Sequence, residues 1–398
     1  MPKLLQINIT ANWGSTGKIA EAIGIAVMKA GWESYIAYGR WSNPSQSHLI
    51  KIGGLYDMYF HFLEQRIRDN EGLCSRIATK RLLRQIEKLK PDVLQLHNIH
   101  DHYLNYRILF DYLNQTDIKV VWTFHDCWAF TGHCFHFVTK YCMRWQTGCH
   151  DCPLRNVYPK TVIDRSKEHY KLKKQLFSRN KNLTIVPCSD WMAGFVRQSF
   201  LKDKQIEVIK NGVDLNVFKP VGNYSITDDL NFGILAVSSV WNEDKGLSDI
   251  YKLHEMLPAN YEITIVGLTK KQVDSLPSGL VGIERTQHVQ ELVELYSSAN
   301  VLINPTYADT FPTVNLEALA CGTPVVTYRT GGSPEAIDNN TGIIVEQGDI
   351  KAMAEAIREI CEGNRLQYAV ACRKRAEECF NKEANYEKYI RLYESLLE

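Results

Sequence analysis

The sequence lacks the long hydrophobic stretches and biased segments that mark membrane-spanning, fibrous and disordered chains. No run in its 398 residues approaches 18 consecutive apolar side chains, so we expect no transmembrane helix. No internal repeat or low-complexity tract is evident, and 45% hydrophobic with 23% charged residues is typical of a globular protein. Residues 1–9 are too short and too polar for a signal peptide and are interpreted as a strand. We therefore expect a cytoplasmic protein.

Net charge is nearly absent as well, at +1, but the two halves of the chain differ. Residues 1–200 contain 27 Lys and Arg against 16 Asp and Glu, whereas residues 201–398 contain 19 against 29. Most of the basic excess lies in residues 64–90 and 155–181, and aromatic side chains precede the first stretch: Tyr56, Tyr59, Phe60 and Phe62. This combination suits contact with the cytoplasmic face of a membrane or a phosphorylated lipid acceptor. A solvated helix face is the alternative, and no nucleic-acid-binding module is recognisable.

Short apolar runs recur along the chain, each followed by a loop and a helical pattern. They are rich in Val, Ile, Leu and aromatic residues with little alternation, as in strands buried on both faces of a parallel sheet. They occupy residues 4–9, 35–38, 93–97, 120–125, 183–189, 232–237, 263–266, 301–304, 325–328 and 343–345. The pattern predicts a doubly wound α/β fold.

The alternation of strands and helices pauses around residues 190–230. We place a domain boundary there, which predicts an N-terminal Rossmann-like domain over residues 1–200 and a C-terminal one over residues 201–379. A helix at about residues 380–398 would be free to pack back on the first domain.

The loop after the first strand contains Gly14, Ser15, Gly17 and Lys18. Glycines between a strand and a helix let the backbone approach an anion at the helix N-terminus. A nucleoside triphosphatase P-loop is excluded by spacing, because Asn12 and Ile19 stand where that motif needs Gly and Ser or Thr. A tight turn with a surface lysine is the alternative.

Residues 304–326 combine a buried strand, a loop carboxylate and a helix that starts at about Pro312. The free N–H groups of Thr313 and Val314 would face a phosphate, and Glu317 would lie near them on the same side of the helix. Asp309, in the loop, is free to contact a sugar. A helix with one buried Glu is the alternative for this segment taken alone.

The spacing of Asp309 and Glu317, followed by Ala-Leu-Ala-Cys-Gly-Thr-Pro, resembles the acidic pair of glycosyltransferase family 4, the retaining group 1 transferases of the GT-B fold. Three further segments resemble the same family: Asn-Gly-Val-Asp at 211–214, Lys-Gly at 245–246 and Gly-Gly-Ser-Pro-Glu at 331–335. The resemblance spans nearly the whole chain. It implies two facing Rossmann-like domains, with the acceptor bound by the first and the nucleotide-sugar donor by the second.

The resemblance also implies roles for individual residues. Lys245 would neutralise the donor diphosphate, Glu317 would bind the ribose, and Asp309 would contact sugar hydroxyls. His125 would face the reacting sugar, so the catalytic set is His125, Lys245 and Asp309. The remaining donor-binding residues would be Gly14, Ser15, Arg285, Thr286, Phe311, Pro312, Thr313 and Val314.

Two positions depart from the family pattern. The family usually has Glu where this chain has Asp309, which reaches about one methylene less. An Arg commonly stands where this chain has Ser239, so the pyrophosphate site has one cation fewer. We hypothesise that Arg285 compensates.

Histidines cluster directly after the strand at residues 93–97. His97 and His100 follow the carboxyl end of that strand, where ligands bind in open α/β folds. They are candidate acceptor-binding residues, and hydrogen-bonded loop histidines are the alternative.

Cysteines are crowded between residues 127 and 152, and the Cys149-x-x-Cys152 pair has metal-ligand spacing. Cys134 and Cys142 would complete a four-thiolate set. A structural zinc, an iron–sulfur cluster and free thiols packing a loop all remain open. The resemblance implies that catalysis itself requires no metal or other cofactor.

Together these features predict a retaining glycosyltransferase that moves a sugar from a UDP- or GDP-sugar to a hydroxyl of a saccharide or lipid-linked saccharide. The segment Asp-Thr-Phe-Pro-Thr-Val-Asn at 309–315 resembles the corresponding segment in enzymes of bacterial capsule or exopolysaccharide synthesis. A nucleotide-sugar epimerase or phosphorylase on the same fold and a non-catalytic metal-binding interaction protein are the alternatives.

Overall fold

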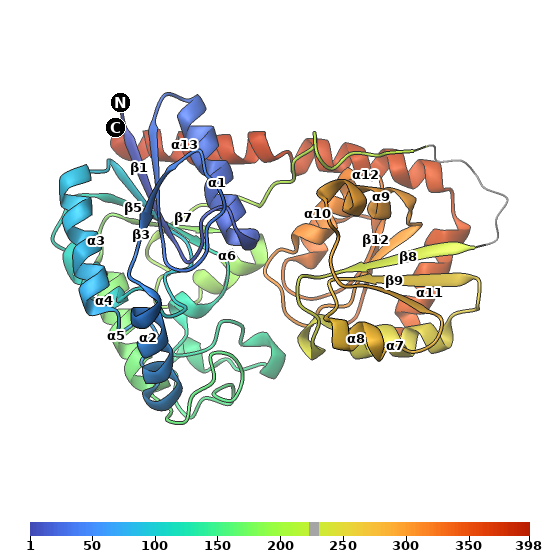
Figure 1. The fold of residues 1–398 in the computed structure, drawn as a ribbon, viewed down its shortest axis with the longest axis horizontal. Coiled ribbons are helices and arrows are strands. Elements are labelled where there is room, and N and C mark those ends of the chain that lie inside the picture. The colour runs from blue at the N-terminus through green and yellow to red at the C-terminus, as the bar shows by residue number, and fades with distance from the viewer. Residues whose placement is uncertain (223–230) are drawn as a thin grey trace. The chain divides into compact units, whose positions relative to one another are not determined.

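The computed structural model describes residues 1–222 and 231–398, and it divides the chain into two compact units (Figure 1). The N-terminal unit consists of Met1–Ile209 and Tyr386–Glu398, and the C-terminal unit is Lys210–Asn385. The domain limits expected from the sequence, after residues 200 and 379, lie nine and six residues before these divisions.

The N-terminal unit is built on a parallel sheet of seven strands in the order β3-β2-β1-β4-β5-β6-β7. Buried and mostly apolar side chains fill both faces of the central strands, as in β4, where every residue is buried and three of the four are apolar. The strands are β1 (Lys3–Asn8), β2 (Glu33–Tyr38), β3 (His48–Lys51), β4 (Val93–Leu96), β5 (Lys119–Phe124), β6 (Leu183–Pro187) and β7 (Gln205–Ile206).

Helices cover both faces of this sheet. They are α1 (Gly14–Lys29), α2 (Leu55–Arg68), α3 (Arg76–Leu89), α4 (Tyr106–Leu113), α5 (Ser166–Arg179), α6 (Asp190–Val196) and the short 3₁₀ turns η1 (Trp128–Phe130), η2 (Val138–Lys140) and η3 (Arg144–Gln146). The last helix, α13 (Lys382–Leu397), returns to this unit beside α1 and β1 (Figure 1). Its Tyr389 hydroxyl lies 3.1 Å from that of Thr123, and the Tyr393 hydroxyl donates to Gln95.

The C-terminal unit repeats the plan with a six-stranded parallel sheet in the order β10-β9-β8-β11-β12-β13. The strands are β8 (Phe232–Val237), β9 (Tyr261–Val266), β10 (Leu280–Ile283), β11 (Val301–Asn304), β12 (Val325–Tyr328) and β13 (Gly342–Val345). The helices are α7 (Leu247–Met256), α8 (Lys270–Asp274), α9 (Val289–Ser298), α10 (Thr313–Ala320), α11 (Ile350–Glu362), α12 (Arg365–Cys379) and the 3₁₀ turns η4 (Glu243–Lys245) and η5 (Ser333–Ala336).

The expected doubly wound α/β architecture is confirmed in both units. All strand pairs are parallel among the described residues, and the first strand of each unit lies in the interior of its sheet. This order puts the carboxyl ends of β1 and β4, and of β8 and β11, side by side, which is where ligands bind in such sheets. No helix in the described part of the chain is long and apolar enough to cross a membrane.

Candidate active site

In the C-terminal unit, Lys245 lies directly against Asp309. The Lys245 ammonium is 2.7 Å from Oδ2 of Asp309 and 3.4 Å from the Ala308 carbonyl oxygen. The Tyr307 N–H donates to the Asp244 carbonyl and thereby joins the loop after β8 to the loop after β11. Gly246 has φ +74°, and a Cβ there would lie 2.2 Å from the Pro305 carbonyl oxygen, so only glycine permits this approach.

Asp309 is fixed at the entrance to α10. Its Oδ1 accepts the Phe311 N–H at 3.3 Å, and a Cβ at Gly331 (φ +56°) would overlap the Asp309 carbonyl oxygen. Pro312 precedes the first helical residue, so the N–H groups of Thr313 and Val314 lie in the first turn, whose amides lack carbonyl partners within the helix. A cation and the positive end of a helix therefore occupy the same loop cluster, which favours an anionic ligand.

Glu317 extends this cluster along α10. Its Oε2 accepts a hydrogen bond of 2.8 Å from the Tyr296 hydroxyl of α9, and the Glu317 side chain remains half-buried. Burial and the neighbouring Glu317 carboxylate raise the pKa of Tyr296 well above its ordinary value, so the phenol stays a donor. This hydrogen bond fixes the orientation of the whole Glu317 carboxylate, as binding a sugar hydroxyl requires.

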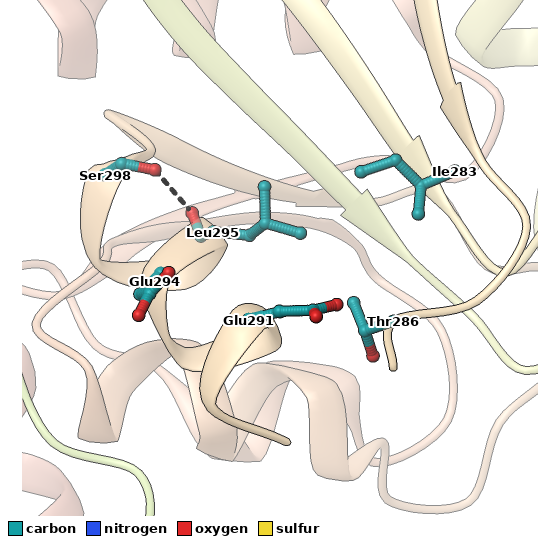
Figure 2. A pocket seen from close by; sticks show the side chains of 6 residues that line it. All are labelled: Ile283, Thr286, Glu291, Glu294, Leu295 and Ser298. Carbon is teal, nitrogen blue, oxygen red and sulfur yellow. Dashed lines mark hydrogen bonds between the residues drawn. The ribbon is translucent and has the colours of Figure 1, made fainter. Parts of the chain in front are cut away.

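A separate cavity of about 340 Å³ lies between the end of β10 and α9, and Figure 2 shows its lining. Thr286 lines it together with Ile283, Glu291, Glu294, Leu295 and Ser298, and Glu291 points toward Thr286 (Figure 2). Arg285, next in the chain to Thr286, is exposed and is not part of the lining. The structure thus places Thr286 at a pocket and leaves the role of Arg285 as a hypothesis.

In the N-terminal unit, Gly14 and Ser15 are exposed at the first turn of α1. Gly14 has φ +64°, which explains the glycine, and a Cβ there would meet open space. Trp13 lies next to it and packs against Trp41, with ring centroids 4.7 Å apart, ring planes tilted by 42° and both indoles exposed. No local sequence pattern indicates this aromatic pair, because the two residues are 28 positions apart.

His97 and His125 form the centre of a buried hydrogen-bond chain. The His97 Nδ1 lies 3.0 Å from Nε2 of His125, and the His97 Nε2 lies 3.0 Å from Oε1 of Gln6. Because the Gln6 amide donates to the Ala20 carbonyl, its Oε1 accepts from His97, and His97 in turn accepts from His125. Burial lowers the pKa of His125 to about 4, so this imidazole is neutral at pH 7.

His100 faces a different partner. Its Nε2 lies 2.8 Å from Oδ2 of Asp126, whose Oδ1 accepts the Trp128 N–H. Burial alone would lower the pKa of His100 and raise that of Asp126, but their mutual attraction dominates. The pKa of His100 is raised, and that of Asp126 falls to about 2. The structure thus places a charged pair beside the neutral His97–His125 pair, and Asp126 was not foreseen.

The cysteines of residues 131–165 lie in a long loop around Cys134. Burial, with the nearby thiols of Cys152, Cys149 and Cys142, holds the pKa of Cys134 well above its ordinary value. Within residues 1–222 and 231–398, however, no group of three or more His, Cys, Asp or Glu side chains is placed to hold a metal ion. The thiol chemistry fits zinc and the geometry does not gather the ligands, so the structural zinc stays a prediction.

The structure therefore gathers Lys245, Asp309, Phe311 and Glu317 around the start of α10, and His97 and His125 at the ends of β4 and β5. Arg285 is not part of the lining of the cavity beside α9. The structure adds Tyr296 and Gln6, which no sequence motif indicates. Tyr and Gln at such positions carry no motif, and only the packing of α9 on α10 and of β1 beside β4 makes them partners.

Two parallel α/β sheets, with a lysine, a carboxylate and a helix N-terminus grouped in the second unit, define a GT-B glycosyltransferase. The sequence models described as Glycosyltransferase Family 4 and Glycosyl transferases group 1 match residues 20–217 and 231–363. The chain belongs to this family, and it is an enzyme that transfers glycosyl groups.

Among curated proteins, the chain is similar to the putative colanic acid biosynthesis glycosyl transferase WcaC of Escherichia coli. The two are 24% identical over 99% of this chain and 100% of WcaC. It is also similar to the N,N'-diacetylbacillosaminyl-diphospho-undecaprenol alpha-1,3-N-acetylgalactosaminyltransferase of Campylobacter jejuni, at 27% identity over 52% of this chain and 58% of that enzyme.

Solved structures share the fold over the whole chain. Sucrose-phosphate synthase from Thermosynechococcus elongatus gives a TM-score of 0.75 at 18% identity, covering 100% of this chain and 99% of that one. HepE of Anabaena, solved in complex with UDP, gives 0.68 at 12% identity over 99% and 100%. At these identities the similarity concerns the fold alone.

Proposed function

We propose that the enzyme transfers a sugar from a UDP-sugar to a lipid-linked saccharide during assembly of a bacterial capsule or exopolysaccharide. The observation that carries the proposal is the grouping of Lys245, Asp309 and Glu317 at the start of α10. The UDP complex of HepE supports the donor nucleotide. The names of WcaC and the Campylobacter transferase support the polysaccharide and the diphospho-undecaprenol class of acceptor.

The C-terminal unit would bind the donor. The Lys245 ammonium and the first amides of α10 would hold the diphosphate, where negative charge grows as the sugar leaves. Glu317, oriented by Tyr296, would accept a hydrogen bond from a ribose hydroxyl. Asp309 would contact hydroxyls of the transferred sugar and keeps Lys245 in place before the donor arrives.

The N-terminal unit would supply the acceptor side. His125 is neutral and donates its Nε2–H to His97, so it would face the sugar as a hydrogen-bonding group rather than a cation. In the reaction the C–O bond to the diphosphate breaks and the acceptor oxygen bonds to the same face of the anomeric carbon. The proton of the acceptor hydroxyl would pass to the departing diphosphate oxygen, and the nucleoside diphosphate would leave. A lipid-linked acceptor would bring this unit to the cytoplasmic face of a membrane.

The test is to incubate the purified protein with a panel of UDP- and GDP-sugars and a diphospho-polyprenol-linked saccharide. We expect release of UDP and one added sugar by mass spectrometry, with the anomeric configuration of the donor retained by NMR. The matched variant Glu317→Gln should lose most of this activity. GDP release in place of UDP would refute the donor, and release that needs no acceptor would refute transfer.

A further inference from the structure

The helix α2 buries polar side chains and exposes apolar ones, which is the reverse of an ordinary surface helix. Its buried positions are polar, with His61 bonded to Ser75 and Gln65 bonded to the Lys160 carbonyl. Its exposed face carries Leu55, Tyr56, Tyr59, Phe60, Phe62, Leu63 and Ile67. Tyr56 is 92% and Phe60 60% exposed. These positions follow the i, i+3, i+4 spacing of a single helical face, so α2 presents a continuous apolar stripe to the outside.

The loop of residues 155–163 continues this stripe. The Val162 N–H donates to the carbonyl of Arg66 at 3.0 Å, which joins the loop to the last turn of α2. Val157, Val162 and Ile163 are exposed on it, with Val162 at 67%. We call the exposed face of α2 together with residues 155–163 the α2–loop surface; Figure 1 shows α2 at the edge of the unit.

Three cations surround a cavity of about 450 Å³ within the α2–loop surface. Arg66, Arg155 and Lys160 line it, with Asn156, Thr161 and Val162, and no acidic residue is among them. In the part of the chain that the structure describes, none of the three basic side chains forms an ion pair or a hydrogen bond. Concentrating three unneutralised cations is unfavourable unless an anion joins them.

We propose that the α2–loop surface docks onto an anionic phospholipid bilayer, with a lipid phosphate held in the cavity of Arg66, Arg155 and Lys160. Charge complementarity selects this occupant, because an apolar stripe around a cationic cavity matches the acyl boundary below a layer of phosphates. A second copy of the chain would place the same three cations against themselves. This docking surface extends the proposed function, because a membrane-bound acceptor explains why the enzyme would bind lipid. Binding to the bilayer itself does not depend on the proposed reaction.

The test is cosedimentation of the full chain with vesicles of phosphatidylcholine alone or mixed with phosphatidylglycerol. We expect binding to the mixed vesicles and little to the neutral ones. Arg66→Ala/Arg155→Ala/Lys160→Ala should weaken binding roughly 100-fold, because each basic side chain near an anionic surface strengthens binding roughly fivefold. The matched control, Lys80→Ala/Arg81→Ala/Arg84→Ala, removes three exposed charges from α3 and should change binding by less than about threefold.

A second variant, Tyr59→Ser/Phe60→Ser, removes apolar area without changing charge and should also weaken vesicle binding. Circular dichroism and thermal unfolding verify that each variant folds. The proposal would be overturned if the protein does not bind mixed vesicles or if both triple variants lose binding equally. It would also be overturned if the protein binds glycerol phosphate saturably but does not bind vesicles. Transfer to a water-soluble acceptor, measured in parallel, should survive in every variant. If no transfer occurs but vesicles bind, the proposed function fails and the docking surface stands.

Discussion

The Lys245 ammonium lies 2.7 Å from Oδ2 of Asp309, although the two residues stand 64 positions apart. A partly exposed ion pair of this kind contributes little to stability by itself. Its consequence is positional, because Asp309 orients the cation and the start of α10 adds a second source of positive potential. The pair therefore prepares the loop cluster for an anionic leaving group.

Removing the cation should impair the reaction. Lys245→Ala is expected to lower kcat/KM by about 10- to 100-fold, the value of one or two charge-assisted hydrogen bonds made to the departing diphosphate. Steady-state kinetics measures it. Lys252→Ala, which deletes an exposed lysine on α7 of the same unit, is the control and should leave kcat/KM unchanged. A Lys245→Ala enzyme with wild-type kcat/KM would remove Lys245 from the mechanism.

Glu317 should act on donor affinity. Glu317→Gln keeps the shape of the side chain but replaces one acceptor oxygen with a donor group, so binding of UDP should weaken about tenfold or more in calorimetry. Tyr296→Phe removes only the orienting hydroxyl and should cost less. Equal losses in the two variants would mean that Tyr296 and Glu317 are mainly structural.

Much of the fold could be predicted from composition along the chain, because strands buried on both faces are nearly continuous apolar runs. The ten expected strands are all present. Three further strands, β3, β7 and β10, were not expected. They are edge or short strands in which one side faces water, so they lack a continuous apolar run. The expected helix at residues 380–398 corresponds to α13, which the tyrosines Tyr386, Tyr389 and Tyr393 mark as buried.

The candidate site was predictable where a motif carries it and not where packing does. Asp309 and Glu317 belong to one contiguous segment, and Lys245 follows a recognisable Lys-Gly. Gln6 and Tyr296 lie in a strand and a helix without unusual sequence, and their roles follow from hydrogen bonds formed only after folding. The cavity beside α2 depends on a loop almost 100 residues further along the chain, so no local pattern indicates it.

The Gln6–His97–His125 chain predicts how the histidine pair will respond to substitution. His125→Ala should abolish most transfer, whereas His97→Gln should retain a hydrogen-bond partner for His125 and lose about tenfold in kcat. Kinetics at saturating donor and acceptor measures the difference. A His97→Gln loss as large as that of His125→Ala would show that His97 itself contacts substrate.

The cysteine loop gives a prediction about metal. Its thiols resist ionisation, since burial raises the pKa of Cys149 to about 11 and of Cys152 to about 12, so zinc must displace protons to bind. Residues 131–165 contain few regular elements, and a structural zinc would hold them together. Elemental analysis decides between a structural zinc and free thiols: one zinc per chain, lost in Cys149→Ser/Cys152→Ser and kept in Cys379→Ser, would establish the site. A wild-type stoichiometry near zero would discard the zinc.

Acid should destabilise the N-terminal unit because several of its histidines are buried in the neutral form. Burial lowers the pKa of His169 to about 4, from an ordinary value of 6.5, so between these values the unfolded chain binds the proton and the folded chain does not. Stability must therefore fall as pH drops from 6.5 toward 4, and this one histidine accounts for about 2 kcal/mol at pH 5.

Urea unfolding at pH 7 and pH 5, followed by tryptophan fluorescence, measures the loss, since seven of the eight tryptophans belong to the N-terminal unit. His169→Gln keeps an N–H for the Asp69 carbonyl. Between the two pH values its free energy of unfolding should fall by about 2 kcal/mol less than that of the wild type. His48→Gln, at an exposed position, should lose as much as the wild type. Parallel pH profiles for wild type and His169→Gln would mean that folding does not lower the pKa of His169.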